Sequence, residues 1–193
     1  MRYFKWILIL VFIGVSFWGI KNAIIWYKEN EEKMLIYLED KITLTLLPYK
    51  IAKLSSLPED KLLPIPVSGV SLSSVADTWQ ARRAGGRTHE GVDIFAKSGT
   101  SVFSATEGYI VRTGVSGLGG INAVVIGPGG VRYYYAHLEK LAEGVERGFP
   151  VTKDTVIGFV GNTGNAINTS SHLHFGIYDR GAKNPYPFLV DRN

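Results

Sequence analysis

The first apolar pattern along the chain is an uncharged run at residues 6–20, which lies between basic residues at Arg2, Lys5 and Lys21. The run is short for a membrane span, but the flanking basic side chains can extend to the lipid headgroups and lengthen the buried stretch. A cleavable signal peptide has an apolar region of similar length, yet the bulky residues that follow offer no small-x-small cleavage site. Residues 1–27 are therefore predicted to form an uncleaved signal anchor with a transmembrane helix.

The pattern changes over residues 28–61. Leu35, Leu38 and Ile42 have the spacing of one helix face, and three prolines then gather in "SSLPEDKLLPIP". Prolines this close together favour an extended chain over a helix. We expect a helical stalk that is followed by a proline-containing linker, with the globular domain beginning at residue 62.

From residue 62 onward, short runs of Val, Ile, Tyr and Phe are separated by turns that contain glycine. "GVDIFA", "NAVVIGPGGVRYYYAHL" and "HLHFGIY" are typical of strands, and "GPGG" is typical of a hairpin turn. Residues 62–193 are therefore predicted to form an all-β domain, a compact antiparallel sandwich or barrel-like structure.

Composition limits the chemistry that this domain can carry. The net charge of +4 comes from charges scattered along the chain, without basic tracts interleaved with aromatic residues, so no nucleic-acid partner is expected. The chain has no cysteine, which excludes disulfides and thiolate metal sites. Histidines and carboxylates are left as candidate metal ligands, and the chain has only four histidines.

Two of these histidines lie in the segment "SSHLHFGIY". In a strand, residues two apart point to the same face, so His172 and His174 stand side by side while Leu173 points into the opposite layer. A core does not favour a pair of imidazoles, because each neutral ring has a donor and an acceptor to satisfy. A polar surface strand is the alternative.

The other two histidines also lie at or beside strand ends. His89 and Asp93 are four residues apart, too far along a straight strand to share an ion, so the chain is expected to bend near Gly91. His137 ends the "YYYAHL" run. A catalytic zinc takes three protein ligands and leaves a position for water, so two histidines and one carboxylate could bind the ion while the other histidines handle protons.

The segments "GRTHEGVDIFAKSGTSVFSATEGYIV", "NAVVI", "YYYAHL", "VIGFVGNTGNA" and "SHLHFGIY" resemble the lysostaphin or LytM-like zinc endopeptidases, metallopeptidase family 23, in order and spacing. The resemblance implies a compact antiparallel β fold with a groove over one zinc ion per chain. It implies that His89, Asp93 and His174 bind this ion and that His137 and His172 assist catalysis.

Further residues are candidates for the substrate groove of such an enzyme. Alternation along the "YYYAHL" strand places Tyr133 and Tyr135 on the same face as His137. Asn122 and Arg87 are also groove candidates, and Arg87 or Arg83 could pair with substrate carboxylates.

The substrates that the resemblance implies are peptide cross-links or stem peptides of bacterial peptidoglycan. Such a substrate lies outside the cytoplasmic membrane, so the domain is expected on the extracytoplasmic side of a single-pass anchor. The tail "HFGIYDRGAKNPYPFL" resembles that of membrane-anchored bacterial members.

Three alternatives stand beside this prediction. A relative without activity could bind and activate other cell-wall hydrolases, although here every ligand and helper residue is present. A biotinyl or lipoyl carrier domain would need an exposed lysine at a tight hairpin, and neither Lys97 nor Lys153 has suitable neighbours. A purely structural zinc site usually has four ligands and many cysteines, which this chain lacks.

Overall fold

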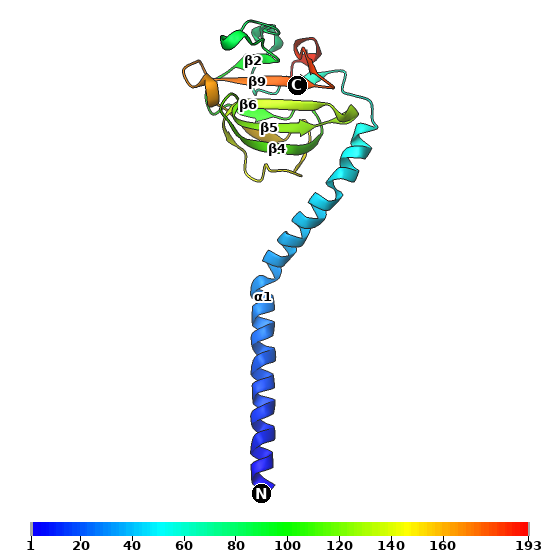
Figure 1. Ribbon diagram of the computed structural model, residues 1–193, viewed down its shortest axis with the longest axis vertical. Coiled ribbons are helices and arrows are strands. Elements are labelled where there is room, and N and C mark those ends of the chain that lie inside the picture. The colour runs from blue at the N-terminus through cyan, green and yellow to red at the C-terminus, as the bar shows by residue number, and fades with distance from the viewer. Residues whose placement is uncertain (1, 193) are drawn as a thin grey trace. The chain divides into compact units, whose positions relative to one another are not determined.

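The computed structural model describes residues 2–192, with side chains described from residue 19 onward except at 23, 27, 29, 32, 34, 40 and 84. The N-terminal part forms a single α-helix, α1 (Arg2–Ser55), which includes Pro48 (Figure 1). The side chains of residues 1–18, which make up most of the predicted anchor, lie outside the described part of the chain. Within the described part of the chain, no helix is both long enough and apolar enough to cross a membrane.

The chain divides into two compact units, Met1–Thr45 and Leu46–Asn193. The second unit contains the last turns of α1, where Leu47 is buried, and all of the described strands. Five short 3-10 helices lie in its loops: η1 (Leu72–Ser74), η2 (Ala84–Gly86), η3 (Pro128–Gly130), η4 (Gly164–Ala166) and η5 (Tyr186–Phe188).

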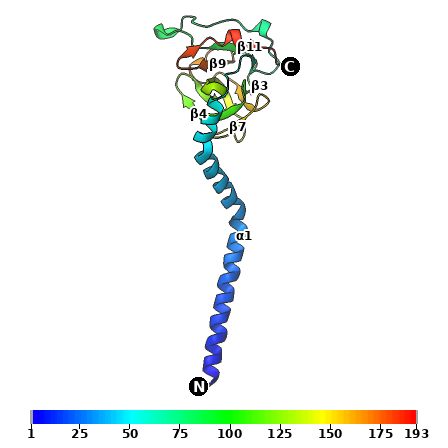
Figure 2. The same cartoon turned by 90° about the vertical axis from the view of Figure 1, so that its right-hand side faces the viewer.

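The strands of the second unit are short and rich in β-branched and aromatic residues, as the sequence predicts. In chain order they are β1 (Leu63–Pro64), β2 (Val92–Phe95), β3 (Ser101–Phe103), β4 (Gly108–Ser116), β5 (Gly120–Ile126), β6 (Arg132–Leu141), β7 (Pro150–Val151), β8 (Val156–Val160), β9 (His172–Tyr178), β10 (Ala182–Lys183) and β11 (Leu189–Val190). Figure 1 labels β2, β4, β5, β6 and β9, and Figure 2 labels β3, β7 and β11 as well.

Nine of the described strands form one antiparallel sheet, and β1 pairs with β11 as a separate parallel pair. The main path through the sheet is β10-β9-β6-β5-β4-β7; β2 pairs with β9, and β8 joins β6 to β3. Among the described strands no pairing connects β10 with β7, so the sheet does not close into a barrel. The antiparallel β prediction is confirmed, and its barrel-like variant is wrong because the sheet branches at β6 and β9 instead.

Strand β6 changes its neighbour partway along its length. Residues Arg132–Ala136 pair with β9, whereas Leu138–Leu141 pair with β8. His137 lies between these two stretches and has a φ of +61°, in the left-handed region that residues other than glycine rarely adopt. The branch point of the sheet is therefore also the position of a histidine that the sequence singled out.

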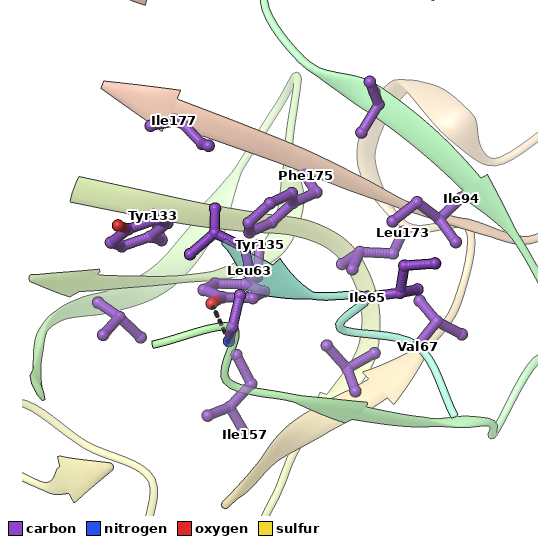
Figure 3. Close-up of a cluster of buried hydrophobic side chains, with 14 of the residues drawn as sticks. Leu63, Ile65, Val67, Ile94, Tyr133, Tyr135, Ile157, Leu173, Phe175 and Ile177 are labelled. Carbon is purple, nitrogen blue, oxygen red and sulfur yellow. Dashed lines mark hydrogen bonds between the residues drawn. The ribbon is translucent and has the colours of Figure 1, made fainter. Parts of the chain in front are cut away.

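One hydrophobic core lies beneath the sheet. Figure 3 shows Tyr133, Tyr135 and Phe175 among the aliphatic side chains of this core, which also takes in Leu63 of β1 and Ile65 just after it. All five are at most 1% exposed. Burying an aliphatic or aromatic side chain fully contributes about 1.5–3 kcal/mol, so many such contributions hold β6, β9 and the segment around β1 together.

Candidate metal centre and active site

Three potential metal ligands converge at the paired strands β2 and β9. Asp93 and His174 are directly opposite each other in the strand register, and His89 lies just before β2. His89 Nε2 is 2.8 Å from His174 Nδ1 and 3.0 Å from Asp93 Oδ1, and the last two atoms are 3.2 Å apart. These three electron-pair donors thus form a tight group that could hold a metal ion.

The orientation of His89 follows from its backbone neighbours. Its Nδ1 lies 2.8 Å from the carbonyl oxygen of Thr78, and because a carbonyl can only accept, Nδ1 carries the hydrogen. The lone pair of the ring is then on Nε2, which faces Asp93 and His174. A backbone carbonyl that fixes the tautomer of a ligating histidine in this way is typical of metal sites.

Gly91 allows the chain to bring His89 and Asp93 together. A Cβ at this position would lie 2.5 Å from the carbonyl oxygen of Phe175 and 2.7 Å from Cε1 of His174. The sequence predicted a bend here because glycine is flexible. The φ of Gly91 is not in the left-handed region, and the requirement for glycine comes from this close approach to β9.

Asp93 is held through both carboxylate oxygens. Its Oδ1 faces the histidines, and its Oδ2 accepts a hydrogen bond from the guanidinium of Arg83. Burial alone would raise the pKa of Asp93, but its interactions with His174 and His89 outweigh burial and hold that pKa well below its usual range. The carboxylate is therefore ionised and able to bind a cation.

The remaining two histidines lie beside this group. His172 Nε2 is 3.8 Å from Asp93 Oδ1, and the ring centroids of His137 and His172 are 5.0 Å apart. Each ring donates from Nδ1 to a backbone carbonyl at 2.8 Å, that of Ser170 for His172 and that of Thr163 for His137. In its neutral form, each ring thus carries the lone pair on Nε2.

Burial lowers the pKa of His137 to about 4, and the charges of His172 and His174 act in the same direction, against the hydrogen bond with Thr163. Burial also lowers the pKa of His174. His137 is therefore neutral near pH 7 and able to accept a proton. The structure thus brings together all five residues that the sequence predicted as metal ligands or catalytic helpers.

This constellation agrees with a comparison to known protein families. The sequence model of peptidase family M23 matches residues 87–185, just over half of the 193-residue chain. The chain belongs to peptidase family M23. The matched range contains every residue of the candidate metal centre and both of the additional histidines.

Two named relatives of this M23 chain are endopeptidases. It is 38% identical over 128 residues to an L-Ala--D-Glu endopeptidase of Bacillus subtilis (strain 168), covering 60% of this chain and 39% of that protein. It is 37% identical over 111 residues to the glycyl-glycine endopeptidase ALE-1 of Staphylococcus capitis, covering 54% and 30%. The chain thus spans less than half the length of either relative.

The fold is also similar to that of solved peptidase structures. The catalytic domain of the antimicrobial peptidase lysostaphin from Staphylococcus simulans superposes with a TM-score of 0.53 at 33% sequence identity. The match covers 59% of this chain and 90% of the lysostaphin domain. The β unit described above is therefore an M23 peptidase fold.

The tyrosines of the M23 domain differ from the prediction. Tyr133 and Tyr135 are 1% and 0% exposed and lie in the core, where the hydroxyl of Tyr135 accepts a hydrogen bond from the backbone N–H of Ala105. Tyr134 lines the cleft instead. Alternation predicted the wrong face because the positive φ at His137 shifts its phase, so that Ala136 and His137 both line the cleft.

A cleft of about 710 Å³ lies over the candidate metal centre. Arg87, a predicted groove residue, lines it, and so does Arg83. Asn122 is buried and donates to the carbonyl of Gly120, and it does not line the cleft. The sequence patterns did not predict Tyr134 as a cleft residue, nor Leu118, which is 56% exposed and also lines the cleft. For Leu118 the available sequence signal was a leucine within the glycine-rich segment "SGLGG".

Proposed function

We propose that this M23 chain is a zinc-dependent endopeptidase that hydrolyses peptide bonds in peptidoglycan cross-links or stem peptides. The observation that carries the proposal is the convergence of His89 Nε2, Asp93 Oδ1 and His174 Nδ1 within 3.2 Å of one another. Two further histidines lie beside them, in a cleft large enough for a peptide.

The donor set fits zinc. Two imidazole nitrogens and one carboxylate oxygen, with a further position free for water or substrate, are the ligands of a catalytic zinc site. Asp93 is ionised, and the hydrogen bond from His89 to Thr78 leaves the Nε2 lone pair of His89 available. When bound, zinc would lower the pKa of a water molecule and polarise the carbonyl of the scissile peptide.

The other two histidines have the geometry for proton transfer. Since Nδ1 of His137 and Nδ1 of His172 are both occupied by backbone carbonyls, their Nε2 atoms are the proton acceptors in the cleft. One of them can accept the proton of the attacking water and pass it to the leaving amine. The other, once protonated, can stabilise the oxyanion of the tetrahedral intermediate.

The substrate and location are further parts of the proposal. Both named relatives are endopeptidases of peptides found in bacterial cell walls, which supports peptidoglycan as the substrate class. Such a substrate would place the domain on the extracytoplasmic side of the cytoplasmic membrane. The uncharged run at residues 6–20, near the start of α1, would be the anchor, and the rest of α1 would connect it to the domain.

The test uses the full-length chain and two variants of the "HLH" pair. The wild type is expected to bind about one zinc per chain and to release peptide fragments from purified peptidoglycan, which mass spectrometry would identify. His174→Ala should lose both zinc and activity. His172→Ala should keep its zinc and lose at least about a hundredfold in rate, because proton transfer is impaired.

Other outcomes would point elsewhere. If the wild type binds zinc but cleaves no peptidoglycan preparation, the chain is a binding protein or activator of other cell-wall hydrolases. If the wild type binds no zinc, the metallopeptidase proposal is wrong. If His172→Ala loses its zinc as His174→Ala does, the assignment of roles within the pair is wrong.

A further inference from the structure

His137 occupies a backbone conformation that its surroundings must hold in place. Its φ of +61° is in the left-handed region, which a histidine rarely adopts. It also lies where β6 leaves β9 and begins to pair with β8, so the regular ladder cannot hold it on both sides. Residues in sparsely populated conformations persist only where neighbouring groups determine them.

Thr163 supplies such a group from another part of the chain. It lies in the loop between β8 and β9, and its carbonyl oxygen accepts the Nδ1–H of His137 at 2.8 Å. Its hydroxyl donates to the carbonyl of Leu138 at 2.8 Å and accepts from the backbone N–H of Ile121 at 2.9 Å. One residue thus contacts the His137 ring, the residue after it, and β5.

The turn between β4 and β5 completes this arrangement. The backbone N–H of His137 donates to the carbonyl of Gly119 at 2.8 Å, and the N–H of Asn165 donates to the carbonyl of Leu118 at 3.1 Å. The Thr163 loop and this turn are therefore bonded directly to each other, and both are bonded to β6. A shift of the loop would move the ring of His137.

We propose that Thr163 is a positioning residue, whose hydroxyl holds the loop so that His137 stays in one tautomer with Nε2 facing the cleft. This inference rests on the proposed function, because it assigns Thr163 a part in that reaction through His137. The hydroxyl acts as donor and acceptor at once, which serine can reproduce and valine cannot. Thr163 does not contact His89, Asp93 or His174 through any of these bonds.

The experiment compares T163V, T163S and the wild type as full-length chains, with T155V as the matched control. Thr155 also accepts a hydrogen bond from a backbone N–H through its hydroxyl, but it lies in the turn between β7 and β8, away from the cleft. T163V is expected to keep its zinc content and its KM within about twofold, while kcat falls about 10- to 100-fold. T163S should recover kcat to within about threefold of the wild type, and T155V should match it.

A second measurement follows the His137 ring directly. Long-range ¹H–¹⁵N NMR spectra of the histidine-labelled chain distinguish the Nδ1–H from the Nε2–H tautomer. The wild type and T163S should show the Nδ1–H form for His137, and T163V a mixture. If T163V does not fold, Thr163→Ala removes the same hydroxyl and is measured in the same way.

These two measurements separate the two proposals. An inactive wild type would contradict the proposed function, and a tautomer mixture confined to T163V would still support the positioning role. A hydroxyl-deficient variant with unchanged kcat and an unchanged His137 tautomer would overturn the role of Thr163. So would a loss of activity that T163S fails to recover.

Discussion

Gly91→Ala is a single-methyl change that tests how the candidate metal centre is built. The added Cβ would lie 2.5 Å from the carbonyl oxygen of Phe175, whereas ordinary contacts begin near 3.4 Å. One partner must therefore move by about 0.9 Å. The carbonyl belongs to β9, which pairs with β2 on one side and β6 on the other, so it cannot move freely.

The His174 ring is the other group that the methyl would meet, with Cε1 at 2.7 Å and Nε2 at 2.9 Å. Overpacking of this kind costs about 1–3 kcal/mol of unfolding free energy. Displacing a ligand or its support typically weakens metal binding about 10- to 100-fold, and we expect zinc affinity to fall in this range.

The assays are urea unfolding of the metal-free chain and calorimetric titration with zinc. Gly114→Ala is the matched control, since a Cβ there meets nothing within 4 Å and the φ of Gly114 is not positive. This control should stay within about 0.5 kcal/mol of the wild type. Zinc affinity within threefold of the wild type in Gly91→Ala, with unchanged unfolding free energy, would refute the close-approach argument.

Three further predictions concern the residues around the centre. Arg83→Met should weaken zinc binding about 10- to 100-fold, because Oδ2 of Asp93 loses the guanidinium that holds it. Arg82→Met, the same change one residue earlier, should leave zinc binding unchanged. Equal zinc titration curves for the two variants would contradict the role of Arg83. Tyr135→Phe should lower the unfolding free energy by about 1–3 kcal/mol, because the buried N–H of Ala105 loses its acceptor. KM should not change. A raised KM would instead indicate that Tyr135 contributes to the substrate groove. Folding lowers the pKa of His137 to about 4, so the unfolded chain binds the proton first as the pH falls below about 6.5. The unfolding free energy of the metal-free chain should therefore fall by about 3 kcal/mol between pH 6.5 and 4. If a His137→Gln variant kept the full loss, the assignment of this pH dependence to His137 would be wrong.

Local patterns predicted the "HLH" pair correctly. Alternation is a property of any extended strand, so two histidines separated by Leu173 had to share a face once the segment formed β9. The structure places Leu173 in the hydrophobic core, and His172 and His174 line the cleft. The resemblance to known zinc endopeptidases rested on the same short motifs and is confirmed by the family match.

The spacing of His89 and Asp93 was only partly informative. It indicated that the chain must bend between them, but not that the carbonyl of Phe175 and the ring of His174 would leave no room for a Cβ at Gly91. Arg83 is a similar case, because its contact with Asp93 joins residues whose proximity depends on the path of a loop. Both facts depend on how separate segments approach each other.

The sequence by itself determined that the domain is built of antiparallel strands and that the two histidines of "HLH" share a face. Its resemblance to known zinc endopeptidases indicated which five residues would gather in one cleft. Tertiary structure decided where β6 changes partner, and so why Tyr134 rather than Tyr133 or Tyr135 lines the cleft. The physical reason is the sequence distance over which each effect acts. Side-chain alternation follows from backbone geometry over a few residues, whereas a phase shift at His137 arises only when β8, β9 and the Thr163 loop meet β6.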